Sequence, residues 1–350
     1  MASTRDVALL RLAALRLAGP GFGTPAEAVR WLAAVQAQDY PGALTSVALR
    51  TRSAGRPEVE AALDAGAVVR SWPMRGTLHF VAAEDLPWML AVTGARTERG
   101  MATRRRQLEL TDDVLARGRE LAETALSGGR GLVRRELFAV WEAAGIATAE
   151  QRGAHLLLHL AQTGVVCLGP VAGGGQRIVL VEEWIREPRG LEREEALAEL
   201  ALRYFRGHGP ATVADLARWT KLTLTDARAG LALVRDELET LVADDTEYLM
   251  DPRTPALLAR HRERARGVIL LPGFDEYMLG YGDRTAALPA EHADAIVPGG
   301  NGMFRPTVVS DGQVVGTWRA EKGGGVAATP FTAFAEGVAE EVAKVYAALP

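Results

Sequence analysis

Hydrophobic residues in the N-terminal region follow the period of a helix until a short polar segment interrupts them. Thr24-Pro25 is typical of an N-cap followed by proline at the first helical position, and Glu27 completes a capping box. The apolar residues that follow keep the spacing of one helix face: Ala28, Trp31, Leu32 and Val35. Pro41 disfavours helical backbone at Tyr40. We therefore predict a helix that begins at Pro25 and ends near Gln38.

Two glutamines stand at the predicted end of this helix, Gln36 and Gln38, on either side of Ala37. Side chains two residues apart diverge by roughly 200° on a helix, whereas in extended backbone they point the same way. Both amides therefore face one site only if the helix unwinds there. The spacing alone favours solvated or helix-capping glutamines, so the rest of the chain has to decide between the two interpretations.

Two or three short helices followed by a pair of strands occur three times along the chain, over about residues 5–82, 111–183 and 193–250. The predicted strand pairs are 68–72 with 77–81, 165–168 with 177–181, and 241–242 with 248–250. Short helix, turn, longer helix and β-hairpin is the winged-helix pattern, a relative of helix-turn-helix. We therefore predict an α+β fold of tandem winged-helix motifs. An unrelated α/β protein with the same order of elements is the alternative.

The last third of the chain has a different pattern. A buried strand is predicted at 267–272, and strands at 304–310 and 313–318 flank Asp311-Gly312, a strong hairpin turn signal. A glycine-rich loop at 322–325 and an amphipathic helix at 332–348 follow. Four segments result: a first winged-helix motif with the glutamine pair and a connecting helix (1–110), a second motif (111–190), a third (191–255), and a C-terminal β-rich element with a hairpin and closing helix (256–350).

Composition is that of an ordinary globular protein, with 48% hydrophobic and 24% charged residues in 350. No apolar run approaches the roughly 18 residues of a membrane span. The single Cys167 excludes an intrachain disulfide and a cysteine-based zinc site, and its apolar surroundings predict a buried, inert thiol. We expect a reducing, cytoplasmic location, with no membrane contact.

The net charge of −4 excludes a basic field over the whole protein, so a nucleic acid would be held by local patches. Arginines cluster in a helical region and beyond it, as a phosphate-binding face would require: Arg96, Arg99, Arg104, Arg105, Arg106, Arg117, Arg119, Arg130, Arg134 and Arg135. A solvated charged face is the alternative. Arg305 and Arg319 stand at the base of the last predicted hairpin, which we expect to reach DNA through its Asp311-Gly312 turn. The other interpretation is that its strands complete a sheet with Trp318 in the core.

Other candidate chemistry is weaker. Asp275-Glu276 follows a strand, but neighbouring carboxylates diverge, which disfavours an acid/base pair. His155 and His159 have metal-ligand spacing on a predicted helix, yet no third ligand is evident. The chain has neither a phosphate-binding P-loop nor a nucleophile elbow, and we predict no metal and no cofactor.

Three motifs occur together in this order: Val35-Gln36-Ala37-Gln38, Trp72-Pro73-Met74-Arg75-Gly76-Thr77-Leu78-His79, and Leu271-Pro272-Gly273-Phe274-Asp275-Glu276-Tyr277-Met278-Leu279-Gly280-Tyr281. Together they resemble the winged-helix DNA glycosylases of the AlkZ and YcaQ type over nearly the whole chain. That family is built of tandem winged-helix motifs and removes N7-alkylated guanines, including bulky adducts and interstrand crosslinks. The Gln–aliphatic–Gln arrangement is similar to the AlkZ-like branch, since the YcaQ-like branch carries Asp in place of the second Gln.

The resemblance implies a monofunctional glycosylase in which Gln36 and Gln38 are catalytic. An amide orients water but is hardly basic, so the two glutamines suit a substrate whose base is already cationic, such as N7-alkylguanine. The implied DNA-binding residues are Arg75, Arg104, Arg105, Arg134, Arg135, Arg305 and Arg319. The expected partner is double-stranded DNA containing alkylated guanine, bound by a monomer associated with the nucleoid. A non-catalytic winged-helix DNA-binding regulator is the alternative.

Overall fold

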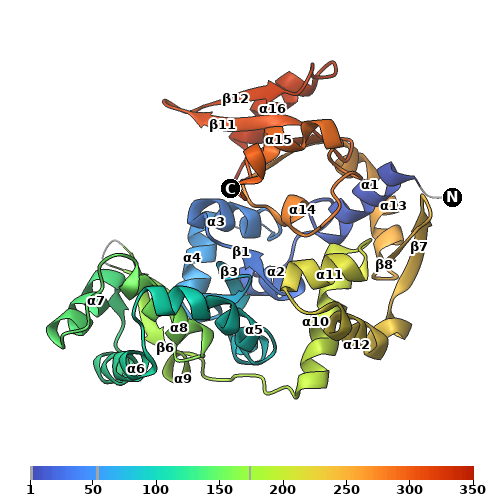
Figure 1. Ribbon diagram of the computed structural model, residues 1–350. Helices are drawn as coiled ribbons and strands as arrows, with labels where there is room; N and C mark the ends of the chain where they lie inside the picture. Colours follow the sequence, from blue (N-terminus) through green and yellow to red (C-terminus); the bar gives the residue numbers. More distant parts are fainter. Residues whose placement is uncertain (1–2, 53–54, 173–174) are drawn as a thin grey trace. The chain divides into compact units, whose positions relative to one another are not determined.

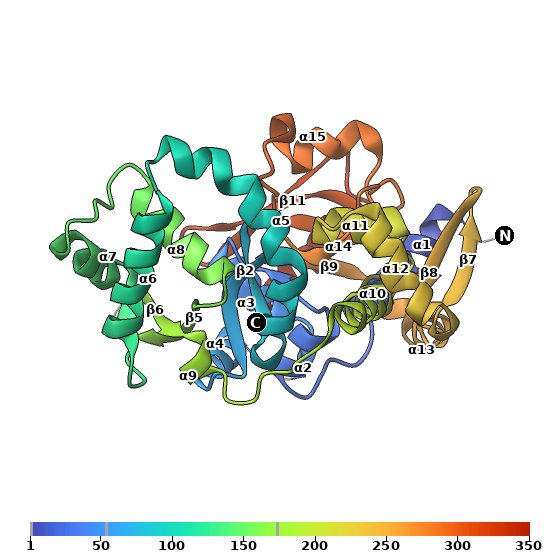
Figure 2. The same ribbon diagram turned by 60° about the horizontal axis from the view of Figure 1, so that its bottom comes forward.

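The computed structural model describes residues 3–52, 55–172 and 175–350, and the chain divides into two compact units. An inserted unit comprises Glu60–Ala196, and an outer unit comprises Met1–Val59 together with Leu197–Pro350. The outer unit holds both candidate glutamines. Figures 1 and 2 show both units in two orientations.

The inserted unit is an antiparallel sheet with helices packed on it. Its strands are hydrogen-bonded in the order β3-β2-β5-β6-β4. Its elements are β2 (Val68–Met74), β3 (Thr77–Ala82), α5 (Leu86–Gln107), α6 (Asp112–Leu126), β4 (Leu132–Val133), α7 (Arg134–Ala143), α8 (Arg152–Gln162), β5 (Val166–Ala172), β6 (Gly175–Leu180) and α9 (Val181–Trp184), and α4 (Arg56–Asp64) leads into it. Trp141 and Leu156 are fully buried in its core, because the apolar faces of α7 and α8 turn inward.

The outer unit combines helices with a four-stranded and a two-stranded antiparallel sheet. Its helices and strands are α1 (Thr4–Ala14), α2 (Pro25–Trp31), β1 (Val35–Gln36), α3 (Tyr40–Ala48), α10 (Arg193–His208), α11 (Val213–Thr220), α12 (Leu224–Val234), β7 (Glu239–Ala243), β8 (Thr246–Met250), α13 (Thr254–Arg266), β9 (Val268–Leu271), α14 (Glu276–Leu279), α15 (Ala293–Ile296), β10 (Thr307–Ser310), β11 (Gln313–Glu321), β12 (Gly325–Pro330) and α16 (Val338–Ala347). The larger sheet has the order β12-β11-β10-β9, and α16 packs on it through Val338 and Val342 (Figure 1).

The α+β class and the three predicted strand pairs are confirmed, as β2–β3, β5–β6 and β7–β8. Residues 173–174, between the strands of the second pair, lie outside the described residues. Two local predictions are wrong. The helix from Pro25 ends at Trp31, and Pro41 lies in the first turn of α3 instead of following a helix. Proline is tolerated there because the first helical N–H groups have no partner within the helix.

The last predicted hairpin forms, and its turn packs against α1, which disfavours the predicted contact of this turn with DNA. Strands β10 and β11 pair across Asp311-Gly312. Gly312 is buried, and a Cβ there would lie 3.1 Å from Leu9 of α1. Asp311 is held by Arg266 Nε at 3.0 Å. The glycine-rich loop expected after β11 instead forms the tip of a second hairpin, β11–β12, whose residues Lys322 to Gly324 are exposed.

Candidate active site around Gln36 and Gln38

The backbone leaves the helical conformation before the glutamine pair. Helix α2 ends with Leu32 as its C-cap, and Ala33 has a φ of 61°, in the left-handed region. Val35 and Gln36 are extended as β1, and Asp39 is the N-cap of α3 with extended backbone. The expected break is therefore present, several residues earlier than predicted. It frees both amides from the divergence that a helix would impose.

The two glutamines differ in their exposure. Gln38 is exposed, whereas the Gln36 side chain is buried, with 7% of its surface accessible. The Gln36 Oε1 atom is fully buried and accepts no hydrogen bond from the residues that the structure describes. Buried carbonyl oxygens nearly always have a partner in folded proteins. Gln36 Oε1 therefore lacks a partner among these residues, and a water or substrate can contact it only when the neighbouring side chains move.

A buried carboxylate lies against the backbone of Gln36. Glu276, the first residue of α14, accepts a hydrogen bond from the Gln36 N–H at 3.2 Å through Oε1. Its other oxygen accepts from Trp219 Nε1 at 2.8 Å and lies 3.3 Å from His208 Nε2. Glu276 and His208 are both fully buried. Sequence reasoning missed this cluster, and its only signal was the carboxylate pair in the Leu271–Tyr281 motif.

The adjacent carboxylate, Asp275, has a structural role. It forms a bidentate ion pair with Arg50, at 2.8 and 2.9 Å, and accepts from Ser46 Oγ at 2.6 Å. It also caps α14 by accepting from the Tyr277 N–H at 2.9 Å. Arg50 and Asp275 are almost inaccessible to solvent. The two neighbouring carboxylates therefore diverge as predicted, and only Glu276 contacts the glutamine segment.

Tyrosines around Glu276 hold the backbone and do not exchange protons. Burial raises the pKa of Tyr204 and of Tyr281 well above the usual tyrosine value, so both hydroxyls stay protonated. Tyr204 donates to the Gly280 carbonyl at 2.7 Å, and Tyr281 donates to the His208 carbonyl at 2.8 Å. These bonds tie the C-terminus of α10 to the segment that follows Glu276.

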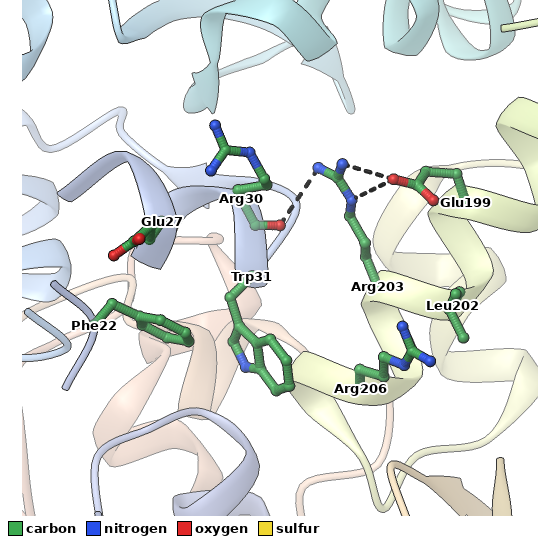
Figure 3. Close-up of a pocket in the computed structure, with 8 residues that line it drawn as sticks. All are labelled: Phe22, Glu27, Arg30, Trp31, Glu199, Leu202, Arg203 and Arg206. Atoms are coloured by element: carbon green, nitrogen blue, oxygen red, sulfur yellow. Dashed lines mark hydrogen bonds and ion pairs between the residues drawn. The ribbon is translucent and has the colours of Figure 1, made fainter. Parts of the chain in front are cut away.

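A cavity of about 380 Å³ lies beside α2, on the same unit (Figure 3). It is lined by Phe22, Glu27, Arg30, Trp31, Glu199, Leu202, Arg203 and Arg206. Neither glutamine lines it. Arg203 is engaged by Glu199 at 2.6 Å and by the Arg30 carbonyl at 3.4 Å, so its charge is already compensated (Figure 3). This cavity is therefore separate from the glutamine pair.

Five of the predicted DNA-binding arginines lie in the inserted unit. Arg104 and Arg105 are in the last turn of α5, and Arg134 and Arg135 are exposed in the first turn of α7. Arg105 is paired with Glu98 at 2.6 Å, within a network that includes His159 at 2.8 Å from the same oxygen. Arg75, in the turn between β2 and β3, contacts His79 Nε2 at 2.7 Å.

The other two predicted arginines lie in the outer unit. Arg305 is exposed, and its Nη1 donates to the Ala295 carbonyl at 3.3 Å. Arg319 is exposed on β11, opposite Ala327 of β12. Both are available to a phosphate, but Arg319 is the one that leads to the exposed β11–β12 tip.

His155 and His159 have metal-ligand spacing, but His159 is already engaged by a hydrogen bond with Glu98. In the described parts of the chain, no three potential ligands among His, Cys, Asp and Glu come together around a common point. Within the same residues, no helix has the length and apolarity needed to cross a bilayer.

Comparison with known proteins decides the family. A family profile described as "DNA glycosylase AlkZ-like" matches residues 29–349. An "Interstrand DNA cross-link repair glycosylase" of Streptomyces sahachiroi is 30% identical over 319 residues, which are 83% of this chain and 81% of that protein. The chain belongs to the AlkZ-like DNA glycosylase family.

A solved member of the AlkZ-like family has the same fold. The structure of Streptomyces sahachiroi DNA glycosylase AlkZ superimposes with a TM-score of 0.83 and 26% sequence identity, over 98% of this chain and 95% of that one. The enzyme is thus a DNA glycosylase, and the non-catalytic regulator that the sequence left open is disfavoured.

Proposed function

We propose that this glycosylase hydrolyses the N-glycosidic bond of cationic N7-alkylguanine, with Gln36 and Gln38 orienting the attacking water. The observation that carries the proposal is the buried Gln36 Oε1, which has no hydrogen-bond partner among the described residues. Gln36 ends the extended strand β1, and the exposed Gln38 follows two residues later in a bend. One amide oxygen thus has no partner within the described protein, and a second amide stands two residues away.

The proposed reaction needs neither a strong base nor an acid. As the bond from the sugar C1′ to guanine N9 breaks, its electron pair moves into the base, which leaves as neutral N7-alkylguanine. Positive charge passes to the sugar, and the water oxygen forms the new bond to C1′. The water proton is released to solvent. Amide oxygens stabilise the polarised water and the cationic sugar through their dipoles, which suits an electrophilic substrate.

The substrate class is proposed from the relative that is named for repair of interstrand DNA cross-links. We infer that this enzyme acts on guanines carrying bulky N7 substituents, including one that joins the two strands. Only the N7-linked guanine has to be hydrolysed to release such a link, because loss of its N9–C1′ bond separates the adduct from one strand. Simple N7-methylguanine shares the cationic leaving group and is the smallest member of the class.

The helices and hairpins of the two units are candidates for holding DNA. We propose that the helices followed by β2–β3, β5–β6 and β7–β8 are winged-helix motifs, within segments 1–110, 111–190 and 191–255, and that 256–350 is the β-rich element. We also propose that the β11–β12 hairpin contacts DNA. Its tip is exposed, it carries Arg319 and Lys322, and Gly323 and Gly324 make the turn.

The substrate class is tested with matched duplexes that contain one N7-methylguanine, one uracil or one mismatch. Alkali then cleaves the strand wherever an abasic site has formed. The proposal predicts cleavage of the N7-methylguanine duplex only. Excision of uracil at a comparable rate would contradict a mechanism that relies on a cationic leaving group.

A further inference from the structure

Glu276 touches the catalytic segment at the point where the chain has left α2. Its Oε1 accepts from the Gln36 N–H at 3.2 Å, although the two residues are 240 positions apart. The bond fixes the plane of the Val35–Gln36 peptide, and hence the direction in which the Gln36 side chain leaves the backbone.

The carboxylate itself is fixed by its surroundings. Trp219 and His208 contact its second oxygen at 2.8 and 3.3 Å. His208 in turn stacks on Tyr204, with ring centres 4.8 Å apart and an angle of 13° between the planes. A Cβ at position 280 would lie 2.8 Å from His208 Cδ2, so Gly280 leaves the space that the imidazole fills. Glu276 is therefore held at both oxygens within a rigid, fully buried setting.

We propose that Glu276 is a positioning residue that aims the Gln36 amide at the attacking water. The inference rests on the catalytic role proposed for Gln36. A rotation of roughly 15° at the Gln36 Cα moves its amide oxygen by about 1 Å, and displacements of that size cost up to about 100-fold in rate. Asp275 has no such role, because its oxygens are engaged by Arg50 and Ser46.

Two double variants of the full-length enzyme isolate the hydrogen bond. Glu276→Gln with Trp219→Phe keeps an oxygen that accepts from the Gln36 N–H. Trp219→Phe is included because the glutamine NH2 group would face the Trp219 indole N–H and cannot accept a hydrogen bond from it. Glu276→Met with Trp219→Phe fills a similar volume without an acceptor. Each pair is also made in a Gln36→Ala background. Single-turnover excision of N7-methylguanine at saturating enzyme, DNA affinity and thermal midpoint are measured for all. If the Trp219→Phe background lowers expression, the same replacements are compared with Trp219 retained.

With Gln36 present, the variant with the acceptor should excise roughly tenfold faster than the variant without it, at equal DNA affinity. In the Gln36→Ala background the two should agree within about twofold, because residues that act as a unit are not additive. Equal rates with Gln36 present would overturn the proposal. So would a tenfold difference that persists without Gln36, since it would indicate a general structural effect.

The Gln36→Ala single variant separates this inference from the proposed function. A wild-type rate in Gln36→Ala would remove the proposed catalytic site, and the role of Glu276 with it. A slow Gln36→Ala enzyme combined with equal rates for the two Glu276 variants would overturn only the positioning role.

Discussion

Replacing Arg50 with methionine should destabilise the outer unit more than any surface substitution. Arg50 is fully buried and donates to the Leu15 carbonyl at 2.9 Å, to Ser46 at 2.8 and 3.0 Å, and to both oxygens of Asp275 at 2.8 and 2.9 Å. Methionine fills part of the space but leaves the Asp275 carboxylate buried without its cation. Breaking a buried pair in this way costs about 3–5 kcal/mol. For a domain of this size the thermal midpoint should fall by roughly 10 °C.

The change is measured by urea unfolding and by calorimetry of the purified variant. Arg117→Met is the matched control, because its pair with Glu120 joins two exposed side chains 3.0 Å apart and should contribute less than about 1 kcal/mol. Adding Asp275→Asn to Arg50→Met should restore part of the loss, since the stranded charge is removed. A loss below about 1 kcal/mol in Arg50→Met, or no recovery in the double variant, would refute the reasoning.

Three further outcomes are expected. Arg319→Ala and Lys322→Ala should each lower the slope of log affinity against log salt by about 0.9, while Lys344→Ala on α16 leaves it unchanged; equal slopes in all three would exclude the β11–β12 hairpin from the interface. Burial raises the pKa of the Cys167 thiol to about 12, so native enzyme should react with a disulfide reagent at pH 8 only as fast as it unfolds. Burial opposes ionisation of Asp251, but the bonds and charge of Arg253 outweigh it and hold the pKa of Asp251 below its usual 3.8. The stabilisation from Asp251 is therefore complete above about pH 4 and is lost as the pH falls through the lowered pKa. The Arg253→Ala variant should begin to lose stability at a higher pH than wild type. Superimposable acid-unfolding curves of the two proteins would contradict this.

The strand pairs could be predicted from local patterns because the alternating apolar residues and the turn signals that define each pair lie close together in the sequence. Strands β2 and β3, for example, flank a turn that contains Arg75 and Gly76, both with positive φ. Strand β12 was missed because Gly325–Pro330 contains small residues with no clear alternation. The end of α2 was misplaced because the left-handed residue is Ala33, which carries none of the usual signals of glycine or asparagine.

The glutamine pair could be proposed from the sequence, but its supporting contacts could not. Glu276 and Gln36 are 240 positions apart, and His208 and Trp219 come from two other helices. No spacing rule connects residues that meet only through tertiary packing. The burial of the Asp311-Gly312 turn could not be predicted either, because it depends on contact with Leu9 of α1 and not on the sequence of the turn.

Single-turnover excision of N7-methylguanine by Gln36→Ala and Gln38→Ala tests the central claim most directly. Each variant should be slower than wild type by roughly 10²-fold, or about 2.7 kcal/mol at 25 °C, because one water-orienting group is lost. DNA affinity and the thermal midpoint should remain near their wild-type values, because Gln36 Oε1 forms no hydrogen bond with the described residues and Gln38 is exposed. Wild-type excision rates in both variants would contradict the account.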